Sequence, residues 1–313
     1  MFFRRVSGRR PRLLCLAAAL FLLLSACTPD RAPSGGGAVP SVPVQTPLVL
    51  PDPPEPAKAS PYPDVPVYFD GLLTDKGYLV EDTLYLSPEA ICGFFGVELK
   101  LTVSADGILL TGDGLELYAI TDLEYMQANS RYLYTPYGYL IEDSRVYLPS
   151  DAVEKILGVS VLFSEDPLLA EIAGGGIVFL EGGEDYYERT FPSEDLFWLA
   201  HIINAESKDE PLAGMIGVGN VVLNRVASPN YPATVYNVVY DREFAIQFEP
   251  IATGGVLDDP EDLPVIATYL CLEGYNTVGD SLFFVNPDKG VSPWFEKELT
   301  PTVVIGLHHF YVD

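Results

Sequence analysis

Two glutamates, Glu206 and Glu210, stand one helical turn apart in the segment Ala205-Glu206-Ser207-Lys208-Asp209-Glu210-Pro211. A carboxylic acid can deliver a proton to the leaving oxygen of a glycosidic bond if it stays protonated near neutral pH. Glu206 falls where an apolar helical pattern ends. The negative end of a helix dipole and apolar neighbours both disfavour a carboxylate, so the sequence predicts a raised pKa and a catalytic role for Glu206.

Glycosidases usually need a second carboxylate as nucleophile or base. Glu210, one helical turn after Glu206, is the candidate for this second carboxylate. A glutamate beside Pro211 more often anchors a loop, so a direct catalytic role and an anchoring role both stay open for Glu210.

Metal and thiol chemistries fit the residues poorly. The chain has only His201, His308 and His309 as imidazole ligands, and adjacent residues on a strand point to opposite faces. We therefore expect no metal and no other cofactor. A cysteine peptidase would pair Cys271 with His308, but Cys271 lies in the middle of an apolar helical stretch, where a reactive thiolate is disfavoured. Cys271 and Cys92 are expected to be buried free thiols.

Two helices should position Glu206. Ser193 is a suitable N-cap for the first, whose apolar residues recur at helical spacing and which must end before Pro211. A second helix is predicted over Ala213–Val226. Its glycines indicate close approach of another backbone, and Asn224-Arg225 is predicted to be a buried hydrogen-bonding pair. The apolar residues are Leu196, Leu199, Ile202 and Ile203, and the glycines are Gly214, Gly217 and Gly219.

A set of ordered motifs extends this segment towards the C-terminus. The motifs after the Glu206 segment are Val218-Gly219-Asn220-Val221-Val222-Leu223-Asn224-Arg225-Val226, Tyr231-Pro232-Ala233-Thr234-Val235-Tyr236-Asn237-Val238-Val239, Gln247-Phe248, Ser281-Leu282-Phe283-Phe284-Val285-Asn286-Pro287 and Ile305-Gly306-Leu307-His308-His309-Phe310-Tyr311. From about Glu194 to Tyr311 the sequence thus resembles the cell wall hydrolase SleB family, named after the spore cortex-lytic enzyme.

The resemblance implies a mainly helical, lysozyme-like domain of the goose-type and lytic transglycosylase kind, with Glu206 as its essential glutamate. The implied reaction cleaves peptidoglycan between N-acetylmuramic acid and N-acetylglucosamine, with the muramic acid 6-hydroxyl attacking its own anomeric carbon. Sugar-positioning groups are expected from Gln247, Asn286 and Tyr236, and a sugar-stacking face from Phe248 or Trp294. A muramidase that uses water, and a wall-binding protein without turnover, are the alternatives; the setting is cell wall or spore cortex.

Residues 67–173 contain an internal repeat. Gly77-Tyr78-Leu79-Val80-Glu81-Asp82 recurs as Gly138-Tyr139-Leu140-Ile141-Glu142-Asp143, and Leu84-Tyr85-Leu86 recurs as Val146-Tyr147-Leu148. Each copy predicts strand, turn, strand and a short helix that ends at Gly96 or Gly158. The pattern resembles the copper amine oxidase N-terminal-like stalk domain, which implies a duplicated α+β spacer or wall-binding module. The stretch has no histidine, so copper is not expected.

The first 27 residues have the features of an export signal, with five arginines before an apolar run that ends in Leu24-Ser25-Ala26-Cys27. This ending resembles a lipobox, so Cys27 is predicted to carry a lipid anchor facing the cell wall from the outer side of the membrane. Residues 28–66 hold 12 of the 27 prolines and predict an extended linker.

The net charge of the whole chain is −26, and removal of residues 1–27 takes away five arginines and no acid, which leaves −31. Nucleic acid is therefore excluded as a partner, and a neutral or weakly charged substrate is expected. The anchor is the expected membrane contact, and the sequence identifies no accessory protein. The predicted division is signal peptide 1–27, linker 28–66, stalk domain 67–173, glycine-rich linker 174–189 and catalytic domain 190–313.

Overall fold

The computed structural model describes residues 60–182, 193–241, 248, 250, 254–289 and 300–312. The predicted signal peptide, Cys27, most of the predicted linker, Gln247 and Trp294 lie outside the described residues. Within the described part of the chain, no helix combines the length and apolar character needed to cross a bilayer.

The N-terminal half of the described chain contains a seven-stranded sheet in the order β11-β12-β1-β2-β3-β10-β9. β1 and β12 are parallel, and the other neighbouring strands are antiparallel. The strands are β1 (Asp64–Phe69), β2 (Leu72–Val80), β3 (Thr83–Leu86), β9 (Leu140–Glu142), β10 (Arg145–Pro149), β11 (Ser160–Glu165) and β12 (Leu168–Ala173).

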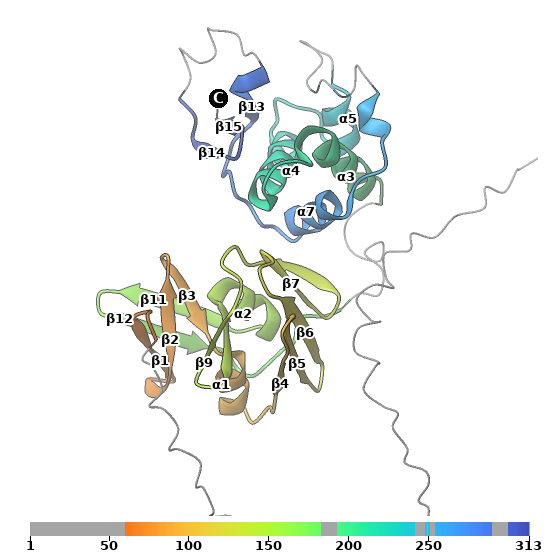
Figure 1. The fold of residues 1–313 in the computed structure, drawn as a ribbon. Coiled ribbons are helices and arrows are strands. Elements are labelled where there is room, and N and C mark those ends of the chain that lie inside the picture. The colour runs from red at the N-terminus through yellow and green to blue at the C-terminus, as the bar shows by residue number, and fades with distance from the viewer. Residues whose placement is uncertain are drawn as a thin grey trace, which may run out of the picture. The chain divides into compact units, whose positions relative to one another are not determined.

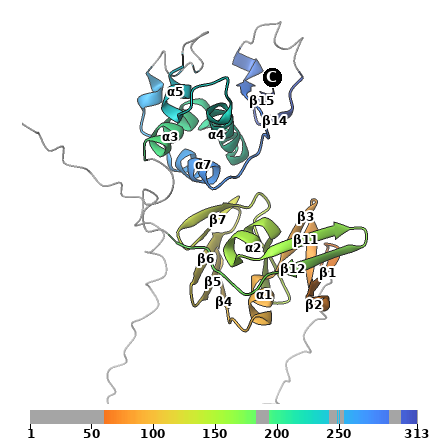
Figure 2. The same cartoon turned by 180° about the vertical axis from the view of Figure 1, so that it is seen from behind.

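A second sheet is a five-stranded antiparallel meander. Its strands are β4 (Lys100–Val103), β5 (Gly107–Gly112), β6 (Leu115–Ile120), β7 (Tyr125–Ala128) and β8 (Arg131–Tyr134). The helices α1 (Pro88–Phe94) and α2 (Ser150–Leu157) lie between the two sheets (Figures 1 and 2). Most buried side chains of both sheets and both helices belong to one hydrophobic core, whereas Tyr78, Val80, Tyr85 and Tyr147 form a separate small cluster on the seven-stranded sheet.

The predicted order of elements is confirmed in both repeated stretches, as β2–β3–α1 and β9–β10–α2. The Ser87 side chain caps α1 by accepting from the backbone N–H of Ala90 at 3.3 Å. Gly96 and Gly158 follow the helices in the left-handed region, with φ of 75° and 64°. The duplication itself and the stalk resemblance stay predictions.

The predicted domain boundary at residue 67 is late, because β1 begins at Asp64. The proline-rich composition up to Pro66 suggested a linker, and a proline cannot donate to a strand ladder. Within β1, however, residues 64–66 pair only with β2, and pairing with β12 starts at Val67. Pro66 thus lies where β1 is an edge, which a sheet tolerates.

The C-terminal half begins with α3 (Ser193–Ser207) and α4 (Leu212–Ala227). The first helix ends before Pro211 and the second extends the predicted Ala213–Val226 by one residue at each end, so both predictions are confirmed. α3, α4 and α7 (Asp262–Leu272) pack against one another (Figure 1). The short helices α5 (Val235–Val239) and η3 (Gly255–Leu257) pack against α3.

Besides these helices, the C-terminal half contains a three-stranded antiparallel sheet in the order β13-β15-β14, which the prediction of a mainly helical domain did not include. Its strands are β13 (Phe283–Val285), β14 (Val303–Ile305) and β15 (His308–Tyr311), and the short helix η4 (Pro287–Lys289) follows β13. β13 contacts α4. The C-terminal half is therefore α+β, and its sheet fixes the segment that contacts Glu210.

The glycines of α4 confirm the predicted close approach, although the neighbours are side chains. A Cβ atom on Gly219 would lie 2.6 Å from the Cys271 sulfur and 2.8 Å from Ile203. A Cβ on Gly217 would lie 2.8 Å from Phe310. Both distances are shorter than real Cβ contacts, so only glycine lets α3, α7 and β15 approach α4 this closely.

Candidate active site

Glu206 lies in the last turn of α3 and is half-buried, and its Oε1 atom is shielded from solvent. Neighbouring side chains fix this turn. The Ser207 hydroxyl donates to the Ile203 carbonyl at 2.7 Å, and Asn204 Oδ1 accepts from the backbone N–H of Glu261, just before α7, at 3.1 Å. The structure thus places one partly shielded carboxyl on a well-anchored helix end.

Glu210 anchors a loop. Its Oε2 atom accepts a hydrogen bond from the backbone N–H of Leu307 at 2.9 Å, which connects the end of the α3–α4 turn to the turn between β14 and β15. Gly306 occupies that turn with φ of 57°, and a Cβ there would lie 2.0 Å from Glu210 Oε2. This contact supports the anchoring role over a direct catalytic role.

His308 directly follows this turn as the first residue of β15, and 3% of its surface is exposed. Its ring packs edge-on against Phe284 at a centroid distance of 5.1 Å. Burial lowers the pKa of His308, the negative charge of Glu210 acts in the opposite direction, and Lys289 lowers the pKa further. His308 is therefore a neutral packing residue beside the candidate site.

Three polar side chains of α4 hold the chain between α7 and β13. Asn220 donates to the Tyr275 carbonyl at 2.9 Å, and Asn224 donates to the carbonyls of Gly279 and Ser281 at 2.7 and 2.9 Å. Arg225 Nε donates to the Leu282 carbonyl at 2.7 Å. These bonds confirm the predicted hydrogen-bonding role of Asn224-Arg225, but of the two only Arg225 is buried, and Asn224 is half-buried. Burial lowers the pKa of Arg225.

An aromatic cluster covers the N-terminal half of α3 and the helix α5. The Trp198 and Tyr236 rings lie 5.2 Å apart, and Tyr236 and Tyr240 lie 4.8 Å apart. Tyr236 is 39% exposed, and Phe197, whose ring contacts Trp198, is 47% exposed. Of the residues in this cluster, only Tyr236 was predicted from the sequence. The aromatic pair Phe197-Trp198, eight or nine residues before Glu206 on one helix, was the signal available for the rest.

Other predicted substrate-binding residues have local structural roles. Asn286 Oδ1 accepts from the backbone N–H of Asp288 at 3.0 Å, beside η4. Phe248 is 2% exposed and packs near Phe284 at 6.2 Å and below the Arg225 guanidinium at 5.4 Å. The expectation that Phe248 offers a sugar-stacking face is therefore wrong for this structure, since its motif position indicated nothing about burial.

The thiols and imidazoles lack a catalytic arrangement in the described chain. Cys92 and Cys271 are buried and free, as predicted, and burial raises the pKa of Cys92 to about 12 and that of Cys271 further. The Cys271 thiol donates to the Ile216 carbonyl at 3.3 Å. His201 Nδ1 lies 2.9 Å from the Val256 carbonyl. Among the described residues, no group of three or more His, Cys, Asp or Glu is placed to hold a metal ion.

Comparison with known proteins agrees with the ordered motifs. Residues 209–311 match the family described as Cell Wall Hydrolase. The C-terminal part of this chain is homologous to cell wall hydrolases. Curated relatives include the spore cortex-lytic enzymes of Bacillus cereus and Bacillus subtilis, which are 30% and 29% identical to the chain over 104 residues. The match covers 33% of this chain in both cases, and 39% and 33% of the two relatives.

Two solved structures are similar in sequence to this hydrolase domain. One is the catalytic domain of SleB from Bacillus anthracis, described as a germination-specific lytic transglycosylase, with 28% identity over 40% of this chain and 98% of that chain. The other is the catalytic domain of Bacillus cereus SleB, with 28% identity over 42% and 100% of the two chains. The TM-score is 0.36 for each.

The family match begins at Asp209, directly after the Glu206-Ser207-Lys208 segment. The predicted resemblance is thus confirmed over residues 209–311, whereas its extension to Glu194 and the role of Glu206 stay predictions. The chain spans less than two fifths of the length of these curated relatives.

Proposed function

We propose that the C-terminal half of this protein cleaves peptidoglycan glycan strands between N-acetylmuramic acid and N-acetylglucosamine, as a lytic transglycosylase. Homology to cell wall hydrolases over residues 209–311 supports the substrate class. The relatives' names, spore cortex-lytic enzyme and lytic transglycosylase, support the reaction and a role in cortex or wall remodelling. The observation that carries the proposal is Glu206, with its shielded Oε1, on the last turn of α3 just before the matched segment.

In the proposed reaction Glu206 acts twice. The protonated carboxyl donates its proton to the oxygen that leaves with N-acetylglucosamine, and the muramic acid 6-hydroxyl attacks the anomeric carbon of its own ring. The Glu206 carboxylate takes up the proton of that hydroxyl, which regenerates the acid and leaves a 1,6-anhydro product. No water is consumed, so one carboxyl is sufficient, in agreement with the anchoring contact of Glu210.

The aromatic cluster of Phe197, Trp198, Tyr236 and Tyr240 is the proposed surface for glycan contact. Aromatic rings bury large apolar areas while their edges and hydroxyls stay polar. Sugar rings present both kinds of surface. Tyr236 and Phe197 are the exposed members, and they lie on or against the helix that holds Glu206.

The further parts of the proposal rest on sequence. Cys27, outside the described residues, is proposed to carry the lipid anchor, and the linker to carry the folded part towards the wall. A Cys27→Ser chain expressed in a bacterial host should move from the membrane fraction to the soluble extracytoplasmic fraction. Unchanged membrane association of this variant would contradict the anchor.

The test of the activity uses the chain from residue 28 to 313, incubated with purified vegetative peptidoglycan and with spore cortex. Soluble muropeptides are analysed by mass spectrometry for the wild type, Glu206→Gln and the control Glu194→Gln, which removes an exposed carboxyl from the first turn of the same helix. Anhydromuramic products from wild type and control, reduced about 10²-fold or more in Glu206→Gln, would support the proposal. Reducing-end products, one water heavier, would indicate a hydrolytic muramidase, and no release from either substrate would favour a wall-binding protein.

A further inference from the structure

The seven-stranded sheet of the N-terminal half has a gap beside β3. β3 pairs with β2 only opposite Tyr78–Val80, and with β10 only opposite Leu148 and Pro149. Within residues 60–182, all of which are described, no strand lies between Leu72–Gly77 of β2 and Arg145–Tyr147 of β10. Where β3 is present, β2 and β10 are two places apart in the sheet, a spacing of about 9.5 Å that one extended chain fills.

At this gap, one backbone N–H of β10 bonds to a side-chain carboxylate in the place where a neighbouring strand would supply a backbone carbonyl. The N–H of Val146 faces away from β9 and donates to the Glu89 carboxylate at 3.3 and 3.4 Å. Glu89 belongs to α1, which the chain enters directly after β3. Across the gap, the alternation of an antiparallel ladder turns the backbone N–H and C=O of Lys76 towards the side where β3 is absent.

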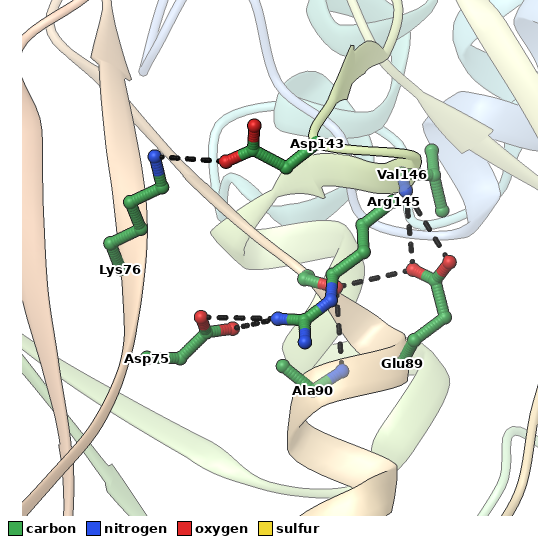
Figure 3. A network of polar contacts seen from close by, with 8 residues as sticks. Asp75, Lys76, Glu89, Ala90, Asp143, Arg145 and Val146 are labelled. Atoms are coloured by element: carbon green, nitrogen blue, oxygen red, sulfur yellow. Dashed lines mark hydrogen bonds and ion pairs between the residues drawn. The ribbon is translucent and has the colours of Figure 1, made fainter. Parts of the chain in front are cut away.

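The gap opens into a groove of about 530 Å³ lined by residues of β2 and of the β9–β10 hairpin. Figure 3 shows four charged side chains that meet across it. Arg145 contacts both carboxylate oxygens of Asp75 at 3.2 and 3.4 Å, and Lys76 lies 3.2 Å from Asp143. Cations and anions thus alternate along the groove, and Leu73, 65% exposed, adds an apolar surface at one end.

These ion pairs are available for exchange with a ligand. The side chains of Lys76 and Asp143 are 39% and 57% exposed, and exposed ion pairs contribute little to stability because water and ions compete for both partners. In the second pair Arg145 is 49% exposed and Asp75 is 15% exposed, so a ligand with its own carboxylate and ammonium exchanges most readily with Lys76, Asp143 and the exposed Arg145 guanidinium. The chain has 18 cationic and 44 acidic residues, so two cations at one groove are a local exception to its charge.

The sequence repeat offers an internal comparison. In the predicted second copy Lys76 corresponds to Tyr137, and in the predicted first copy Arg145 corresponds to Thr83. Lys76 belongs to the first copy and Arg145 to the second, and neither cation is repeated at the equivalent position of the other copy. The two cations therefore come together only because β2 and β10 both line this groove.

We propose that this groove binds an extended, zwitterionic peptide, added along the line of β3 between β2 and β10, and that the ligand is the short peptide attached to muramic acid in peptidoglycan. Strand addition supplies main-chain hydrogen bonds, as in other domains that bind extended peptides. Arg145 and Lys76 bind the peptide carboxylates, and Asp75 and Asp143 bind its amine. The identity of the ligand rests on the proposed function, whereas the groove lies outside the hydrolase domain and is tested without catalysis.

The probe is a synthetic wall-type pentapeptide, alanyl-γ-D-glutamyl-lysyl-D-alanyl-D-alanine, with a fluorophore at its N-terminus and a free C-terminus. Binding to the chain of residues 28–313 carrying Glu206→Gln is followed by fluorescence anisotropy. Arg145→Gln should weaken binding tenfold or more, and a C-terminally amidated peptide should bind more weakly to the chain with Arg145 intact. The matched control is Lys100→Gln, which removes an exposed cation from β4 of the other sheet and should leave the affinity unchanged.

Equal affinity of the Arg145→Gln and control chains, or absence of binding to the chain with Arg145 intact, would overturn the proposal. Circular dichroism melting of each variant shows whether the fold is kept, and Asp143→Asn, at the exposed hairpin turn, gives a second test with the same expected direction. Peptide binding without muropeptide release by the active chain would refute the proposed catalysis but support the proposed peptide-binding groove. Muropeptide release without peptide binding would refute the groove alone.

Discussion

The Oε2 atom of Glu210 accepts a hydrogen bond from the backbone N–H of Leu307 at 2.9 Å, and the two residues are 97 positions apart in the chain. The bond joins the turn that follows the helix of Glu206 to the β14–β15 turn. A carboxylate that holds a backbone N–H in this way serves the geometry of the site. Glu206, on the helix end itself, is then the one of the two glutamates proposed for proton transfer.

Glu210→Gln should keep activity within about threefold of wild type, a change of less than 1 kcal/mol in the activation free energy. The glutamine carbonyl oxygen can still accept from Leu307. Glu210→Ala removes the acceptor and should lower the free energy of unfolding by about 0.5–1.5 kcal/mol, because the bond is exposed to water. Urea unfolding and muropeptide release measure the two effects, with Asp209→Ala, an exposed carboxyl in the same turn, as the control. Loss of activity in Glu210→Gln as large as in Glu206→Gln would assign Glu210 to the chemistry.

Gly306→Ala should destabilise the protein through two separate effects. The alanine would adopt a left-handed φ of 57°, which costs about 1–2 kcal/mol for an L-residue. Its Cβ would also lie 2.0 Å from Glu210 Oε2, so the Glu210–Leu307 bond should break.

Gly279→Ala is the matched control for Gly306→Ala. Gly279 has φ of 58°, and its Cβ would meet no atom within 4 Å. Urea unfolding should show a larger loss for Gly306→Ala, and the excess should shrink when Glu210 is already alanine, leaving the part caused by Pro211 Cδ at 2.9 Å. An equal loss for both glycine variants would mean that the Glu210 contact has no energetic weight.

His308 should make stability depend on pH. Burial lowers its folded-state pKa from the usual 6.5, so below pH 6.5 the unfolded chain binds a proton that the folded chain does not. The stability contributed by neutral His308 is thus present above pH 6.5 and is lost as the pH falls below it. Urea unfolding at pH 7.5 and 5.0 should show a smaller pH effect for His308→Gln than for wild type. An unchanged pH effect in His308→Gln would contradict the assignment.

Helices in both halves of the described chain were predictable because their ends depend on local chemistry. Pro211 stops α3, the glycines of α4 mark tight packing, and Gly158 ends α2 in the left-handed region. These signals act over a few residues and are visible in the sequence. The β4–β8 meander was missed because its strands are only four to six residues long, and although β6 and β7 alternate in burial, β4 and β5 do not and acquire their faces from pairing and from the helices beside the sheet.

The site residues also divide into those that local chemistry predicts and those whose position depends on tertiary packing. Asn224 and Arg225 were identified because a polar pair in an apolar helix must find partners. Phe248 was misassigned because order along a motif carries no information on burial, and Trp198 was missed because its exposure depends on how α5 packs on α3. The groove at β2 and β10 depends on where β3 stops and could not be read from sequence.

Tyr236 tests whether the aromatic cluster contacts the glycan by stacking or by its hydroxyl. The ring is 39% exposed and packs on Trp198 and Tyr240. Tyr236→Ala should lower kcat/KM by about 2–12-fold, equivalent to about 0.5–1.5 kcal/mol for one aromatic contact. Tyr236→Phe should keep the wild-type value if stacking dominates and fall with Tyr236→Ala if the hydroxyl positions the sugar. Tyr137→Ala, at a 51% exposed tyrosine of the N-terminal half, is the control, and kinetics equal to wild type in Tyr236→Ala would place the glycan elsewhere.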